Sequence, residues 1–210
     1  MKLVKAYSNT SDNTFCLQAS ILSVLNYYFS GKVFSEEEVG VNTDYHPKYF
    51  SWFPKSVVWL DKLGLDVKLY SPADYKRIGI EGLEYLKELK GKMYEVEEKR
   101  GEYKYLPEVQ IAIKEMISSN LWIDKMLSVE ELRNELKDQD TLAIGKTIYE
   151  WLDGNYIAGK SHFITIVKEY SSEVWLIQDP GLPKKQDRKV NQYINGHSIL
   201  GDIILIKNHK

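Results

Sequence analysis

The most informative pattern in the sequence is a hairpin over residues 161–181, SHFITIVKEYSSEVWLIQDPG. Two runs of β-branched and aromatic residues flank a polar break at Tyr170-Ser171-Ser172, which predicts two antiparallel strands joined by a turn. Antiparallel pairing brings the start of the first strand, with His162, beside the end of the second strand, with Asp179. A turn centred on Ser171-Ser172 makes the two residues diagonal neighbours, and a turn one step earlier places them directly opposite each other.

Both registers leave the imidazole and the carboxylate within reach, at roughly 5–8 Å between Cβ atoms. A slip by one residue would put the two side chains on opposite faces of the sheet, so the expectation depends on the register. His162 could instead be a buried core histidine and Asp179 a turn aspartate before Pro180. The hairpin alone leaves both interpretations open.

The composition is that of a soluble globular protein, with 210 residues, 43% hydrophobic and 28% charged. The formal net charge is −2, so the composition does not show the excess of basic residues that is typical of proteins that bind nucleic acid or an anionic membrane. No apolar run is long enough to span a membrane, and the N-terminal residues become polar too early for a secretory signal. The single cysteine excludes an internal disulfide framework and suits a reducing compartment, so we expect a cytoplasmic protein. The oligomeric state is not readable from the sequence.

Cys16 is expected in the first turn of a buried helix. Residues 12–14, Asp-Asn-Thr, form a cap cluster, and the apolar positions that follow recur at helical spacing up to a stop at Gly31. Unpaired backbone N–H groups and the positive end of the helix dipole favour an anion there, so a thiolate would be stabilised. A single cysteine on an apolar helix is more often a small hydrophobic side chain of the core, and that interpretation also stays open for Cys16.

The rest of the chain divides into helical and β-rich segments. Capping boxes at Ser35 and Ser128 and a proline at position 54 predict three further helix starts. Residues 71–127 show no strand signal and two helical patterns, one over residues 82–100 with an apolar stripe and one from Pro107. Strands are expected over residues 65–70, 141–145, 147–152, 199–207 and the hairpin. The aromatic loop over residues 45–53 could wall a substrate groove or form a buried connection.

Helices early in the chain and strands late predict an α+β fold. We expect one domain over residues 1–210, with a helical half over about 1–70 packed on an antiparallel β-sheet in a β half over about 128–210. A helical insertion over about 71–127 should separate the two halves and pack beside the cleft between them.

Cys16, His162 and Asp179 together can supply the parts of a nucleophilic site. A thiol needs a base to become a thiolate, and the base needs a partner that fixes its tautomer. His197 is an alternative base, although its glycine context favours a turn. One cysteine and four scattered histidines give no metal-ligand spacing, so we expect no zinc. No phosphate-cradling loop or dinucleotide fingerprint is present, and we expect no cofactor.

The order of these residues resembles that of papain-like cysteine peptidases, in which Cys, His and Asn or Asp lie on a helical half followed by a β half. The nearest resemblance is to the compact branch that includes the bacteriocin-leader-processing (double-glycine) peptidases. The matching segments are TFCLQAS at residues 14–20, KSHFITI at 160–166, IQDP at 177–180 and the capped helix at Ser128. The resemblance covers both ends of the chain but leaves out residues 71–127.

The resemblance implies a papain-like fold and a cysteine peptidase, or an amide-bond hydrolase or acyltransferase, that acts on a peptide or a small amide through a thioester on Cys16, with His162 and Asp179 completing a triad. Two positions depart from the family pattern. Leu17 stands where a glycine usually follows the nucleophile, and the oxyanion-hole Gln is missing, which leaves Asn9 and then Asn13 as candidate donors. These departures keep open an alternative, a catalytically inactive homologue that acts as a peptide-binding module.

Overall fold

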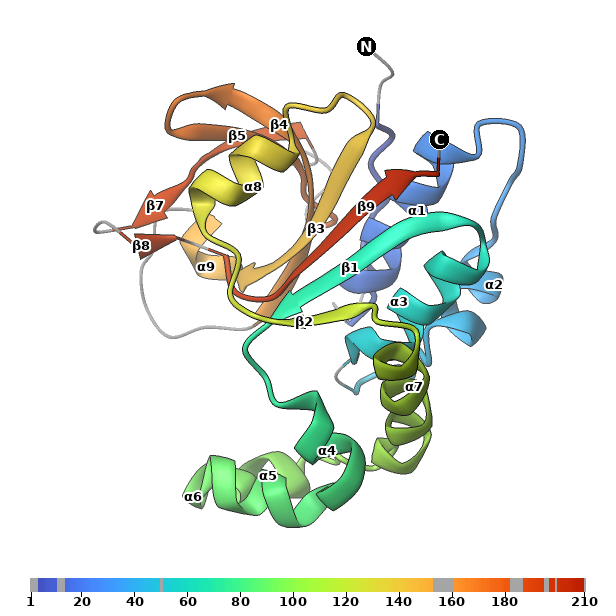
Figure 1. Ribbon diagram of the computed structural model, residues 1–210, viewed down its shortest axis with the longest axis vertical. Coiled ribbons are helices and arrows are strands. Elements are labelled where there is room, and N and C mark those ends of the chain that lie inside the picture. Colours follow the sequence, from blue (N-terminus) through green and yellow to red (C-terminus); the bar gives the residue numbers. More distant parts are fainter. Residues whose placement is uncertain are drawn as a thin grey trace.

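A computed structural model describes residues 4–10, 14–49, 51–152, 161–181, 187–194, 197–198 and 200–209. They form a seven-stranded mixed sheet in the order β2-β1-β9-β3-β4-β5-β6 (Figure 1). Its strands are β1 (Leu65–Ser71), β2 (Trp122–Asp124), β3 (Thr141–Ile148), β4 (Ser161–Ser171), β5 (Val174–Gln178), β6 (Asp187–Asn191) and β9 (Ile203–Asn208). Two short strands, β7 (Tyr193–Ile194) and β8 (His197–Ser198), pair in a separate sheet.

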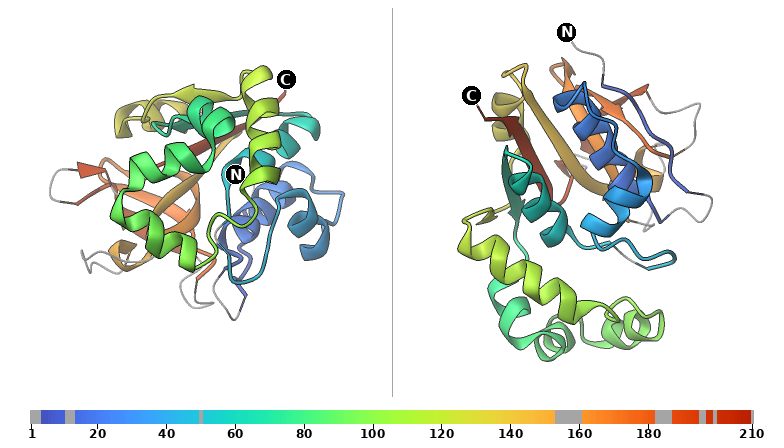
Figure 2. Two further views of the ribbon diagram at one scale, coloured as in Figure 1. Left: turned by 90° about the horizontal axis from the view of Figure 1, so that it is seen from below. Right: turned by 90° about the vertical axis from the view of Figure 1, so that its right-hand side faces the viewer.

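The large sheet is buried on both faces, because helices pack on each side of it (Figure 2). In β9, Ile204 and Ile206 face the core built around α1 (Cys16–Tyr28), whereas Ile203 and Leu205 face the core built around α8 (Val129–Glu135). This two-sided burial explains why β9 reads as an uninterrupted apolar run rather than an alternating one.

The expected helices near the ends of the chain are confirmed. Helix α1 packs along β4 and places its N-terminus at the end of the sheet where β4 begins. Ser128 forms a complete capping box with Glu131 at the start of α8. The other helices here are α2 (Glu36–Asn42), α3 (Phe53–Lys62) and α9 (Tyr149–Leu152). No helix among the described residues is long and apolar enough to cross a membrane.

The inserted segment between β1 and β2 is a stack of helices below the sheet in Figure 1. Its members are α4 (Tyr75–Glu81), α5 (Leu83–Lys90), α6 (Lys92–Lys99) and α7 (Leu106–Ser118). Helix α7 packs on α3 and closes the core, α4 packs on α7, and α5 and α6 follow outward.

The single helix expected over residues 82–100 is wrong. Gly91, at φ +54°, divides it into α5 and α6, because this backbone conformation interrupts a right-handed helix and suits glycine. The apolar residues of this segment therefore do not form one buried helix face. Leu86 is buried, but Leu89 and Met93 are more than half exposed, at 55% and 53%.

Two other expectations about the strands need correction. Residues 71–127 do contain a strand, β2, which pairs in parallel with β1. The strand expected over residues 147–152 ends at Ile148, and helix α9 follows it. The antiparallel sheet expected in the C-terminal half is confirmed, because all pairings among β3, β4, β5, β6 and β9 are antiparallel. The sheet also takes in β1 from the helical half of the chain, and the β1–β2 pair makes it mixed.

The hairpin forms with an unexpected turn and two register shifts. Its two turn residues are Ser172 and Glu173, one position later than the sequence suggested. Register irregularities between Glu169 and Ser171 and between Ile166 and Lys168 then restore the pairing of Thr165 with Gln178. Continuing this register by one step makes His162 the diagonal neighbour of Asp179, as in the first of the two expected registers.

Candidate active site

Cys16 is the first residue of α1, and its side chain is almost fully buried, with 7% exposed. The helix has no side-chain cap at its N-cap residue, Phe15. Instead the Oδ1 atom of Asn9 accepts hydrogen bonds from the backbone N–H groups of Phe15, at 2.7 Å, and Thr10, at 2.9 Å. The cap cluster expected over residues 12–14 lies partly outside the described residues. Asn9 therefore anchors the chain entering the helix that carries the thiol.

His162 lies near the start of β4, where it pairs with Thr147 of β3. Its side chain is buried, and the ring of Tyr149 packs edge-on against it, with centroids 4.9 Å apart and planes at 90°. These contacts leave the imidazole little freedom to rotate.

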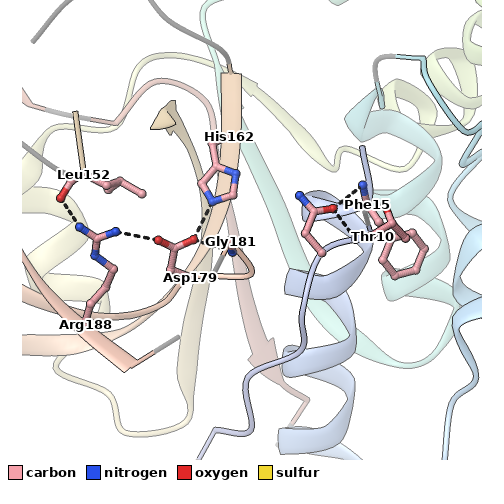
Figure 3. A network of polar contacts seen from close by, with 8 residues as sticks. Thr10, Phe15, Leu152, His162, Asp179, Gly181 and Arg188 are labelled. Atoms are coloured by element: carbon pink, nitrogen blue, oxygen red, sulfur yellow. Dashed lines mark hydrogen bonds and ion pairs between the residues drawn. The ribbon is translucent and has the colours of Figure 1, made fainter. Parts of the chain in front are cut away.

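Asp179 follows β5 directly and is completely buried. Its Oδ1 atom accepts hydrogen bonds from His162 Nε2, at 2.7 Å, and from the backbone N–H of Gly181, at 2.8 Å (Figure 3). Its Oδ2 atom accepts a hydrogen bond from Arg188 Nη1 at 2.9 Å. Burial alone would raise the pKa of Asp179, but these donors and the charge on His162 hold it below its ordinary value.

The Cys16 thiol is close enough to the His162 imidazole for the two side chains to interact by hydrogen bonding and charge. Because Nε2 of His162 is directed to Asp179, Nδ1 is the ring nitrogen that remains for the sulfur. Burial by itself would lower the pKa of His162, but the hydrogen bonds with Asp179 and Cys16 and the charges of both groups raise it to about 9. This arrangement stabilises the protonated imidazole of His162.

The two oxyanion-hole candidates have different outcomes. With its Oδ1 occupied by backbone donors, Asn9 retains the two N–H groups of its Nδ2, which make no hydrogen bond to the residues that the structure describes. Asn9 is also joined to the residue after Asp179, because its backbone N–H donates to Pro180 O at 2.6 Å. Asn13 lies outside the described residues. Leu17 is fully buried in the core on the α1 side of the sheet.

Three residues that contact His162 or Asp179 were not predicted from the sequence. Arg188 in β6 reaches Asp179 from the side opposite His162 (Figure 3). Tyr149 covers the imidazole, and Gly181 donates to the carboxylate. The Pro180-Gly181 turn was visible in the sequence, but its N–H contact depends on the fold of the turn. The alternative base His197 lies in β8, where its backbone pairs with Ile194.

A pocket of about 530 Å³ adjoins the start of β4 and includes Ser161, the residue next to His162. One wall comes from the inserted helices, with Tyr75, Leu86 and Leu89, and the other contains Phe53 from the start of α3. The aromatic loop expected to be either a groove wall or a buried connection does both: Trp52 lines this pocket, while Tyr45 packs on Phe15 at 4.8 Å.

The charged groups of this pocket are paired with each other. Lys146 lies 3.3 Å from Asp202, Lys90 lies 3.2 Å from Glu97, and Arg100 lies 3.8 Å from Glu102. The pocket therefore offers aromatic and aliphatic surface with little net charge. Among the described residues, no group of three or more His, Cys, Asp or Glu could hold a metal ion.

Comparison with known proteins supports the fold. No family model matches the sequence, and no curated protein matches it. Among solved structures, the chain is similar to the peptidase domain of Streptococcus ComA, described as a bifunctional ABC transporter involved in a quorum-sensing pathway. The superposition has a TM-score of 0.53 at 11% sequence identity and covers 97% of this chain and 98% of that domain. The chain thus has the α+β, papain-like fold of a peptidase domain, as the resemblance of its sequence segments led us to expect.

Proposed function

We propose that the protein is a cysteine peptidase in which Cys16 is the nucleophile, His162 the proton carrier and Asp179 the residue that orients His162. The observation that carries the proposal is the continuous contact from thiol to imidazole to buried carboxylate. Each side chain comes from a different element, α1, β4 and the turn after β5, so local sequence alone does not bring them together. The papain-like fold supports the same function.

In the proposed reaction, the Cys16 thiolate attacks the carbonyl carbon of an amide and forms a carbon–sulfur bond. The negative charge that develops on the oxygen is met by the backbone N–H of Cys16 at the helix start and by the Nδ2 group of Asn9. His162 gives the proton on Nδ1 to the leaving nitrogen as the carbon–nitrogen bond breaks, which leaves a thioester. Water then attacks the thioester while His162 takes its proton, and breakage of the carbon–sulfur bond returns the thiolate and releases a carboxylic acid.

Asp179 takes no proton in this scheme. Its carboxylate receives the Nε2–H of His162, which fixes the tautomer with Nδ1 toward the sulfur and stabilises the imidazolium. The ring of Tyr149 limits rotation of the imidazole away from this position.

The pocket beside Ser161 supports a preference for extended peptides with an apolar side chain next to the cleaved bond. The inserted helices α4–α6 form one of its walls, so a substrate chain has to pass between them and the body of the protein. A folded protein presents few segments that can enter such a pocket. The paired charges of the lining give no counterion to a charged side chain, whereas its aromatic surface suits an apolar one.

An electrophilic probe tests the proposal, because the chain contains a single cysteine and labelling therefore has one possible site of thiol attack. We would treat the protein with iodoacetamide at pH 6 and follow adduct formation by intact-mass spectrometry for the wild type, His162→Ala and a control, His209→Ala, at an exposed histidine directly after β9. Rapid labelling that is lost only in His162→Ala supports the peptidase.

The rival function is a peptide-binding protein that keeps the fold without the chemistry, and it is favoured by Leu17 and by the missing Gln. It predicts equally slow labelling of all three proteins. In that case peptides from a library should be bound by the protein and recovered uncut.

A further inference from the structure

Asp179 lies between two cationic side chains from neighbouring strands. His162 of β4 contacts Oδ1 at 2.7 Å, and Arg188 of β6 contacts Oδ2 at 2.9 Å. In the pairing of β5 with β6, Arg188 lies opposite Ile177, which is two residues before Asp179. The Arg188 side chain therefore approaches the carboxylate diagonally from β6, as the His162 side chain does from β4. The imidazolium of His162 can lose its proton as the pH rises through about 9, whereas a guanidinium group keeps its charge.

This arrangement has an electrostatic consequence. A fully buried carboxylate needs a countercharge, and removal of its last partner is costly. If His162 were the only cation, loss of its proton would leave Asp179 buried and uncompensated, and the imidazolium would be held very tightly. Arg188 supplies a permanent countercharge, so the carboxylate stays compensated whether His162 carries one proton or two.

We propose that Arg188 is a positioning residue that acts through Asp179: it fixes the carboxylate toward His162 and weakens its hold on the imidazolium, so that the base can both give and take a proton. This inference rests on the proposed peptidase function for its meaning in catalysis. Its physical content, an effect of Arg188 on the proton affinity of His162, is independent of that function.

The second contact of Arg188 is one that a lysine at this position could not add to the contact with Asp179. Its Nη2 group donates to the carbonyl oxygen of Leu152, the last residue of α9. Helix α9 begins with Tyr149, whose ring packs against His162. The guanidinium therefore ties the carboxylate to the helix that covers the imidazole, and a lysine, with its single nitrogen, cannot reproduce this planar two-nitrogen bridge.

The test measures the titration of His162 directly, by the NMR signal of its Cε1–H, which is assigned as the signal missing from His162→Gln. Arg188→Gln should raise the pKa of His162 by about one unit, because the Asp179 carboxylate loses its second cation and holds the imidazolium more strongly. Arg188→Lys should keep it near the wild-type value. Lys189→Gln is the matched control, since Lys189 is the next residue of β6 and lies over the ring of Tyr170. An unchanged or lowered pKa in Arg188→Gln overturns the proposal.

Where Arg188→Gln does not fold, a second pair of variants gives the answer. Asp179→Asn removes the carboxylate and leaves Arg188 beside a neutral amide, and the double variant with Arg188→Gln removes both charges of the buried pair. Because Arg188 acts through the carboxylate, the pKa of His162 should be nearly the same in these two variants, and a value about one unit higher in the double variant overturns the proposal. Failure of the proposed peptidase function can be told apart from failure of this inference. In that case the wild type would not be labelled by iodoacetamide, but the pKa of His162 would still change when Arg188 is replaced.

Discussion

The backbone N–H of Asn9 donates to the carbonyl oxygen of Pro180 across 2.6 Å. This bond connects the segment that leads into α1 with the turn that follows β5. On one side Asn9 holds Phe15 at the helix start, and on the other Asp179 holds His162. The position of the thiol relative to the imidazole is thus fixed by a short chain of hydrogen bonds, in addition to the packing of α1 on the sheet.

Replacement of Asp179 by Asn should leave measurable activity but move the pH profile. The amide keeps the shape of the side chain and removes the charge that raises the pKa of His162, while Arg188 remains nearby. The imidazole then loses its proton more easily, so the upper limb of the pH–rate profile should shift to lower pH by about one unit or more. Cys16→Ala and His162→Ala should each fall to background. A profile identical to that of the wild type would remove Asp179 from the site.

Asn9 should have two separable roles, one in stability and one in catalysis. Asn9→Ala loses the acceptor for the Phe15 and Thr10 N–H groups and should lower the free energy of unfolding by about 0.5–2 kcal/mol. Asn9→Asp keeps that acceptor but loses the Nδ2 donor, so it should retain most of the stability while kcat falls by about 10²–10³-fold. Urea unfolding and peptide hydrolysis on the same samples measure the two effects. Full activity of Asn9→Asp would exclude Asn9 as the oxyanion donor.

Gly181→Ala should disturb the Asp179 carboxylate. A Cβ atom at position 181 would lie 2.9 Å from Asp179 Oδ1 and 3.0 Å from a ring carbon of Tyr149. Both groups contact His162, so we expect kcat/KM to fall by about ten- to a hundredfold as the imidazole shifts. Gly31→Ala is the matched control, because a Cβ there meets nothing within 4 Å. Equal kcat/KM values for the two variants would contradict the close packing of Gly181 against Asp179 and Tyr149.

The pocket beside Ser161 can be tested with two exposed apolar residues of the inserted helices. Leu89 lines the pocket, whereas Met93, equally exposed on α6, lies outside its lining. Leu89→Glu should raise KM for peptides with an apolar residue beside the cleaved bond by about tenfold, because it places a charge in apolar surroundings. Met93→Glu should leave KM unchanged. A matching rise in both variants would mean that the inserted helices do not form the substrate wall.

Stability should depend on pH through His162. Its pKa is raised from 6.5 to about 9 in the folded protein, so the stabilisation is fully present below pH 6.5 and is lost as the pH rises through about 9. The free energy of unfolding, measured in urea between pH 6 and pH 9.5, should therefore fall more steeply for the wild type than for His162→Gln. Parallel curves for the two proteins would show that the pKa of His162 is not raised by folding.

The sequence predicted which residues lie together in the candidate site better than the path of the chain that brings them there. Cys16, His162 and Asp179 could be identified because each is a reactive residue at the end of a strongly patterned element. The register was predicted for the wrong reason: the turn falls at Ser172-Glu173, and only the two irregularities in the hairpin return His162 to the diagonal of Asp179. Either irregularity alone would leave the two residues on opposite faces.

The residues that sequence reasoning missed depend on contacts between distant segments. Arg188 carries no local signal, since its role follows from the pairing of β6 with β5 and from the depth of Asp179. Strand β2 has three residues and exists because it pairs with the end of β1, next to α7. The glycine at position 91 is visible in the sequence, but the positive φ that separates α5 from α6 there depends on how these two helices pack.

The position of β9 in the sheet has a consequence for biosynthesis. It follows all the other strands in the sequence, yet it lies between β1 and β3. Until it emerges from the ribosome, β1 and β2 cannot be joined to the rest of the sheet, and both cores lack the wall that β9 provides. Cys16 is made long before this, so the nascent chain carries its nucleophile while the framework that aligns its partners is incomplete. We therefore expect reactivity to appear late in co-translational folding, as a last step rather than a gradual gain.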